Sequence, residues 1–210
     1  MLSLNSSDIK NILKEILKLM QENRDYLVEL DAKAGDGDLG ISMCQGFTAI
    51  CKGLETEDSQ DIGKIMMKAS MILNEASPST LGTILSVALI KGAKPLKGKT
   101  EIGVKEAADF FTAGIEAIME RAGSKRGEKT ILDALCAGND SLIESAKIGE
   151  SLNVAVKKAY ESAHQGMLDT INMRAVHGRA AYYAESSIGK QDGGATVGML
   201  IFKGIHNYIG

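Results

Sequence analysis

The sequence predicts an all-α fold, and three observations support this prediction. Aromatic residues make up only 4% of the chain and tryptophan is absent, which disfavours a β-sandwich. Only two prolines occur, Pro78 and Pro95, so long helices are rarely interrupted. Apolar residues recur at helical spacing through most of the chain. Its 210 residues can bury a sizeable core, and we expect a single domain over residues 1–210.

Eight helices are expected in order along the chain. In the first half they cover about 7–29, 38–53, 62–73 and, after Pro78, 81–90, the last being apolar on nearly all sides and therefore buried. In the second half they cover about 101–122, 130–147, 151–170 and 194–208. Thr130 and Asp133 fit a capping box, and Gly123 fits a helix stop. Between 171 and 192 the helical pattern breaks up.

Composition argues against several classes of function. The net charge is −3, so the chain as a whole does not favour nucleic acid or an acidic membrane surface. Cys44, Cys51 and Cys136 have no metal-ligand spacing, and we expect free, reduced thiols. The sequence shows no signal-peptide pattern and no long apolar run. We therefore expect a cytoplasmic protein that binds neither membrane nor nucleic acid.

One acidic stretch stands out, from Asp31 to Gly40. Asp31, Asp36 and Asp38 fall close together and are separated by glycines, which let the backbone turn sharply. Carboxylates packed this closely repel one another unless they take up protons or bind a cation, and hard oxygen ligands suit Mg²⁺. The alternative is an ordinary helix start with Asp38 as its N-cap, which explains one aspartate and leaves two unexplained.

Two stretches partly match known ligand-binding motifs, one for phosphate and one for Ca²⁺, but neither match is complete. Residues 93–100 fit a loose phosphate-binding loop, yet no strand is expected before them. Counted from Asp36, the glycine and glutamate that an EF-hand needs do not fall in place.

Polar turns near helix starts could also bind an anion. Ser77 and Ser79 stand at such a turn, where free N–H groups favour phosphate, although simple capping explains them equally well. Gly193 and Gly194 precede the last helix, and Arg179 could pair with a phosphate or form an exposed salt bridge.

Together these motifs resemble the L subunit, the nucleotide-binding domain, of the dihydroxyacetone kinase family. The family signature is an Asp followed by Gly-Asp-Gly-Asp-His-Gly, and this chain has Asp31 and then Gly-Asp36-Gly-Asp38-Leu39-Gly40. Gly127–Thr130 with Asp133, Gly178–Ala180 and Gln191–Thr196 follow in the family's order, so the resemblance spans nearly the whole chain. It implies an eight-helix antiparallel barrel with the nucleotide site at one end.

The resemblance also implies cofactors and site residues. Asp31, Asp36 and Asp38 would hold two Mg²⁺ ions that bridge the phosphates of ADP or ATP, and would be the catalytic residues. The residues that would line the nucleotide are Leu39, Gly40, Ile41, Ser42, Ala76, Ser77, Arg179, Asp192, Gly193 and Gly194. The reaction would be phosphoryl transfer to a small hydroxy-ketone, such as dihydroxyacetone, in which positioning and charge neutralisation do most of the work.

The resemblance further implies a partner. Family members hold the substrate on a separate K subunit or domain, and no such domain is present in this chain, so a K-type partner is expected. The phosphoryl donor would be either ATP or a phosphotransferase-system protein that recharges a resident ADP. A homodimer is also open.

The chain departs from the family pattern at three places. Leu39 replaces a histidine, Asn74–Ser79 replaces a glycine-rich segment, and Asp192-Gly-Gly194 replaces Asp-Pro-Gly. The aspartates are retained, so we expect Mg·nucleotide binding, with a divergent substrate or partner. Two alternatives stay open: a non-catalytic nucleotide-sensing or partner-binding subunit, and a domain like that of the fatty-acid kinases, which carry a different aspartate motif in much longer chains.

Overall fold

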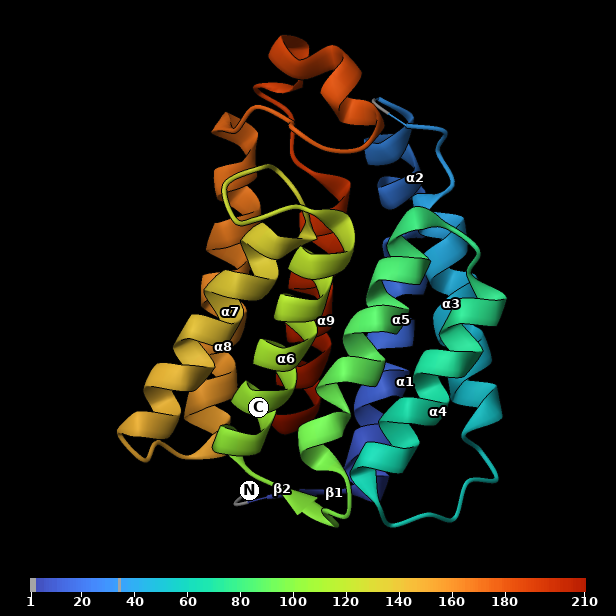
Figure 1. Cartoon of the computed structure of the whole chain (residues 1–210), viewed down its shortest axis with the longest axis vertical. Coiled ribbons are helices and arrows are strands. Elements are labelled where there is room, and N and C mark those ends of the chain that lie inside the picture. Colours follow the sequence, from blue (N-terminus) through green and yellow to red (C-terminus); the bar gives the residue numbers. More distant parts are fainter. Residues whose placement is uncertain (1–2, 34) are drawn as a thin grey trace.

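A computed structural model describes residues 3–33 and 35–210 of the chain (Figure 1). The α-helices of these residues are α1 (Ser6–Glu22), α2 (Arg24–Ala32), α3 (Leu39–Gly53), α4 (Ile62–Ala76), α5 (Thr80–Gly92), α6 (Val104–Ala122), α7 (Ile131–Lys147), α8 (Leu152–Asp169) and α9 (Gly193–Ile209). Short 3₁₀ helices are η1 (Lys94–Leu96), η2 (Thr170–Asn172) and η3 (Arg179–Ser187), and two short strands are β1 (Leu4–Asn5) and β2 (Glu101–Ile102).

The long helices close into a ring. From α3 to α9 each helix packs against the next, and α1 packs against both α3 and α9. Eight helices therefore form an up-and-down barrel, while α2 continues from α1 at the upper end in Figure 1 and packs against α3. This architecture confirms the expected all-α barrel.

The first expected helix, 7–29, is wrong as a single element, because the chain breaks at Asn23. The side-chain Nδ2 of Asn23 donates to the carbonyl of Leu19 at 2.8 Å, and the backbone N–H of Asn23 donates to the same carbonyl at 3.0 Å. The side-chain bond takes up a carbonyl of the last turn of α1, Asn23 has φ −104 and ψ 10, and α2 begins at the next residue, Arg24. The break matters because α2 carries Asp31 at its C-terminal end.

Two other features differ from the expectation. The helix expected from about 101 begins at Val104, because Glu101 and Ile102 pair antiparallel with Asn5 and Leu4. Part of the irregular stretch between 171 and 192 is the 3₁₀ helix η3. The capping box of α7 is confirmed: Thr130 accepts from the N–H of Leu132, and Asp133 accepts from the N–H of Thr130.

The barrel interior is apolar, and the polar loops lie at the two ends of the barrel. Fully buried side chains from most of the helices fill it, among them Met43, Ile65 and Phe202, around a cavity of about 140 Å³ lined almost wholly by apolar side chains. Cys44, Cys51 and Cys136 are free thiols. Within the described residues, none of the helices combines the length and the apolar character needed to cross a membrane.

Helix direction fixes what gathers at each end. Both chain ends lie at the lower end in Figure 1, and α3, α5, α7 and α9 all begin at the upper end. The α2–α3 loop, the α4–α5 turn and residues 170–192 are therefore collected at the upper end. These are the segments in which the sequence places the candidate site residues.

Candidate functional site

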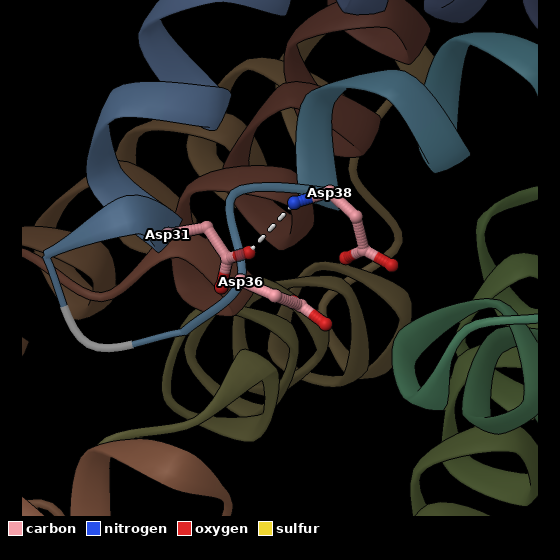
Figure 2. A group of neighbouring side chains, drawn as sticks. All are labelled: Asp31, Asp36 and Asp38. Carbon is pink, nitrogen blue, oxygen red and sulfur yellow. Dashed lines mark hydrogen bonds between the residues drawn. The ribbon is translucent and has the colours of Figure 1, made fainter.

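The three aspartates converge at the upper end of the barrel. Asp31 lies on the last turn of α2, and Asp36 and Asp38 lie between α2 and α3 (Figure 2). Each offers a carboxylate oxygen, and these oxygens lie within 4.8 Å of one another. In the described part of the chain this is the one such group of three potential metal ligands.

Glycines make this approach sterically possible. A Cβ on Gly35 would lie 2.3 Å from Oδ1 of Asp31, and Gly37 has φ +74, which side-chain-bearing residues rarely adopt. The backbone N–H of Asp38 donates to Oδ2 of Asp31 at 3.1 Å, closing the loop on itself (Figure 2). Among the described residues the Asp38 side chain makes no capping bond to α3, so the simple N-cap explanation does not account for this aspartate.

The charge of the cluster is only partly balanced. Burial, together with the charges of Asp36 and Asp31, raises the pKa of the Asp38 carboxyl above its usual value. Arg179 opposes this rise, and its Nη2 lies 2.7 Å from Oδ2 of Asp36 in a pair that is largely exposed. Three adjacent hard oxygen donors with a surplus of negative charge fit a divalent cation such as Mg²⁺.

The start of α3 lies against both α2 and α9. A Cβ on Gly40 would lie 2.1 Å from the carbonyl oxygen of Arg24, so glycine is needed for α3 to approach α2. A Cβ on Gly193 would lie 2.7 Å from Cδ2 of Leu39, which is buried. Leu39, at the start of α3, thus packs against the start of α9. Ile41 is exposed. Ser42 is buried, and its Oγ donates to the Leu39 carbonyl at 3.2 Å.

The start of α9 is organised by Asp192. Its carboxylate accepts from the N–H of Ala195 at 2.7 Å, and its own N–H donates to Oγ1 of Thr170 at 3.1 Å. Burial raises the pKa of the Asp192 carboxyl to about 6. Gly193 and Gly194 form the first turn of α9, where backbone N–H groups have no partner within the helix.

Ala76 and Ser77 lie at the α4–α5 turn, and among the described residues no hydrogen bond or ion pair joins them to the aspartates. Ser77 is fully buried, and a Cβ on Gly46 of α3 would lie 3.1 Å from its Cβ. Ser79 caps α5 by accepting from the N–H of Gly82 at 3.1 Å. The α4–α5 turn therefore packs against α3, the helix that follows the aspartate loop.

Sequence reasoning assigned no role to Lys129, although the structure makes it central to this end of the barrel. Its buried ammonium donates to backbone carbonyls of the segment that carries Arg179. Carbonyl partners leave no mark in a sequence. The only available signal was the position of Lys129 within the Gly127–Thr130 motif.

The fold and the site together define an all-α barrel that presents a cluster of potential metal ligands beside several helix N-termini. The model of one family, described as the DAK2 domain, matches residues 33–207. The chain therefore belongs to the DAK2 domain family.

Relatives in this family are of two sizes. The chain is 30% identical over 202 residues to the ADP-binding subunit DhaL of the PEP-dependent dihydroxyacetone kinase of Escherichia coli, covering 96% of each chain. It is 32% identical to the ADP-binding subunit DhaL of the PTS-dependent dihydroxyacetone kinase of Lactococcus lactis, covering 88% of each. It is also 30% identical to human triokinase/FMN cyclase, where it covers 92% of this chain but 34% of that one.

Solved structures support the same fold. The native form of the dihydroxyacetone kinase of C. freundii matches with a TM-score of 0.77 at 20% identity. That match covers 97% of this chain and 35% of the other, so this chain corresponds to about a third of that protein. The same kinase in complex with AMP-PNP and Mg²⁺ matches with a TM-score of 0.74.

Proposed function

We propose that this chain is the nucleotide-binding subunit of a dihydroxyacetone-type kinase. The observation that carries the proposal is the convergence of Asp31, Asp36 and Asp38, whose oxygens lie within 4.8 Å, beside the guanidinium of Arg179. It occurs in a chain that matches ADP-binding DhaL subunits over nearly their whole length. The chain would bind ADP or ATP with Mg²⁺ at the upper end of the barrel.

Each part of the site has a role in this proposal. The aspartates would hold Mg²⁺, with two ions as the finer expectation, and bound Mg²⁺ would neutralise and orient the phosphates. Arg179 and the N–H groups that begin α3 and α9, at Leu39–Ile41 and Gly193–Gly194, would donate to phosphate oxygens. Ser42, whose N–H donates to the carbonyl of Asp38 at 2.8 Å, would line the site beside them. Asp192 would hold the α9 start in place through its cap. Ala76 and the buried Ser77 would shape the neighbouring wall.

The chemistry needs no protein nucleophile. Phosphoryl transfer depends on holding donor and acceptor in line and on stabilising the charge of the transferred group. The acceptor would be a small hydroxy-ketone, such as dihydroxyacetone, bound to a separate K-type subunit that docks at the loop end. The donor would be ATP or a phosphotransferase-system protein that recharges a resident ADP, and a homodimer is a further proposal.

The test is binding followed by reconstitution. ADP would be titrated calorimetrically into the protein with Mg²⁺ and again with EDTA, for wild type and for Asp31→Asn. We expect binding that needs Mg²⁺ and is weakened about tenfold or more in the variant. Mixing with a K-type subunit, dihydroxyacetone and either donor system should then yield dihydroxyacetone phosphate.

The outcomes separate the alternatives. Product formed with ATP alone identifies the direct donor, and product formed only with the phosphotransferase proteins identifies the recharging route. Nucleotide binding without transfer to any K-type partner would favour a sensing subunit. Absence of Mg²⁺-dependent nucleotide binding would sink the proposal.

A further inference from the structure

Lys129 stands in an unusual backbone conformation just before α7. Its φ is +62, and it is the one non-glycine with positive φ among the described residues. This left-handed conformation is unfavourable for a lysine. The residues on either side are held by Asp133, whose carboxylate accepts from the N–H of Gly127 at 2.5 Å and from the N–H of Thr130 at 2.7 Å. The turn therefore aims the Lys129 side chain inward, where the residue is only 5% exposed.

The Lys129 ammonium is surrounded by backbone carbonyls. Nζ lies 2.6 Å from the carbonyl oxygen of Thr170 and 3.2 Å from that of Met173. It also lies 2.9 Å from the carbonyl oxygen of Ser187 and 2.5 Å from that of Lys190. An ammonium has three donors, so these four acceptors share them. None of the four is a carboxylate; opposite charge comes from the nearby Asp192 and Asp133.

These four carbonyls lie at the two ends of one segment, residues 170–190, which we call the excursion because it leaves the barrel between α8 and α9. The excursion leaves the barrel at η2 and returns at Lys190, just before α9, so a single ammonium ties its beginning to its end. A second bond closes the same base, from the N–H of Gly189 to the carbonyl of Ile171 at 2.7 Å. The tied base lies directly before Asp192, whose N–H is held by Thr170.

The far part of the excursion carries Arg179, which faces the acidic cluster. Glu128, next to Lys129, holds His177 through an Oε2–Nε2 contact of 2.6 Å. Beyond it, Nη2 of Arg179 lies 2.7 Å from Oδ2 of Asp36. Because this ion pair is exposed, it is too weak to place the excursion by itself. The position of Arg179 must therefore depend on the Glu128–His177 contact and on the base, where the bonds are buried and charge-assisted.

We propose that Lys129 is a positioning residue for the nucleotide site: its buried ammonium clamps residues 170–190, and so holds Arg179 and the start of α9 opposite the three aspartates. This inference rests on the proposed function. A lysine suits the task because its compact ammonium can reach several carbonyls at once, whereas a planar guanidinium would need more room. The unpartnered carbonyls left by its removal would drive the base of the excursion open.

The experiment compares Lys129→Met with Lys190→Met. The first keeps an unbranched side chain only one atom shorter and removes the ammonium. The second removes an exposed charge from the same segment but keeps the bond from its carbonyl to Lys129. Hydrogen exchange would be followed across the chain, and the dissociation constant of Mg·ADP would be measured. Both measurements would be repeated in an Arg179→Ala background. Lys129→Gln, which has the same reach as methionine and keeps two N–H donors, serves as a second variant if Lys129→Met does not fold.

We expect Lys129→Met to speed exchange selectively in residues 171–191 and to weaken Mg·ADP binding roughly tenfold to a hundredfold. The weakening should shrink when Arg179 is already absent, because part of the lost affinity acts through Arg179. Lys190→Met should leave both measurements close to wild type. Unchanged exchange, a uniform rise across the barrel, or an equal loss of affinity in the Arg179→Ala background would each overturn the proposal.

Two further outcomes concern folding of the Lys129 variants and nucleotide binding by the wild type. If neither Lys129 variant folds, Lys129 serves folding in general, and a role specific to the site is refuted. If wild type fails to bind Mg·ADP, the proposed function falls, and no positioning role in a nucleotide site remains; the exchange data would then still show whether Lys129 clamps the segment.

Discussion

Leu39 shows how one residue can change the character of the site without removing it. It occupies the position of a histidine in the family signature, and the structure buries it against Gly193. The polar contact that a histidine could offer to phosphates is replaced by an apolar contact between the starts of α3 and α9. In the proposed nucleotide site, phosphate binding at these helix starts would then depend on backbone N–H groups and on Arg179.

Asp192 gives the site a pH-dependent component. Burial raises the pKa of its carboxyl from 3.8 to about 6, with Asp133 adding to the rise and Lys129 opposing it. The folded protein therefore holds this proton more tightly than the unfolded chain does. The contribution of the group to stability is full below about pH 4 and is lost as the pH rises through about 6.

Asp192→Asn tests this sign. Asparagine can still cap α9 through its amide oxygen but does not titrate. As the pH rises from 4.5 to 7.5, wild type should lose roughly 1–3 kcal/mol more free energy of unfolding than the variant does. Denaturant unfolding at both pH values measures the difference. A difference between variant and wild type that stays constant with pH would show that the carboxyl is not perturbed by burial.

At the residue scale, the sequence was informative where the interacting groups are neighbours. Asp31, Asp36 and Asp38 meet because only a few residues separate them and glycines let the loop close. Lys129 was not assigned a role, because its partners are carbonyls 41 to 61 positions away along the chain. Their approach depends on how α7, α8 and α9 pack.

At the scale of elements, apolar periodicity located most helices well. The structure places helices over 39–53, 131–147 and 193–209, close to the ranges expected. Apolar periodicity did not predict the break at Asn23, because this polar residue separates α1 from α2 without disturbing the apolar pattern. The strands β1 and β2 have two residues each, too few to show any period.

The contact between α2 and α3 sets the distance between Asp31 and Asp38, and Gly40 makes that contact possible. Alanine is the better helix former by about 1 kcal/mol, yet its Cβ at position 40 would lie 2.1 Å from the Arg24 carbonyl oxygen. We expect Gly40→Ala to lower the free energy of unfolding by roughly 1–3 kcal/mol.

A matched control lies at the other end of the same helix. At Gly53 an added Cβ would meet mainly Cδ1 of Ile72, the movable end of a flexible side chain. Gly53→Ala should therefore cost far less than Gly40→Ala in denaturant unfolding. Equal effects of the two substitutions would contradict the close packing of α2 on α3.

At the scale of the whole molecule, the up-and-down barrel explains why the site is where it is. Helices α3, α5, α7 and α9 all begin at the upper end, so the positive ends of their dipoles surround the region that the nucleotide phosphates would occupy (Figure 1). In the proposed function the aspartates would supply the cation site beside them. The sequence predicts the helices, but the order in which they close the ring depends on tertiary packing.

The proposed function makes a prediction for the whole protein, because a ligand that binds only the folded state must stabilise it. At about 100 times its dissociation constant, a ligand adds roughly 2.7 kcal/mol, which raises the melting temperature of a chain of this size by several degrees. Because Mg²⁺ held by the aspartates is expected to bridge them to the phosphates, Mg²⁺ and ADP should stabilise the protein far more together than separately.

The most direct test is a set of thermal melts of the EDTA-stripped protein with Mg²⁺ alone, ADP alone, and both. Asp36→Asn would be melted in parallel, with Asp58→Asn, an exposed aspartate in the α3–α4 loop, as the matched control. We predict a shift of several degrees that requires Mg²⁺ and ADP together, persists in Asp58→Asn and is lost in Asp36→Asn. Melting temperatures that do not change under any condition, or a shift that survives in Asp36→Asn, would contradict the metal-bridged nucleotide site.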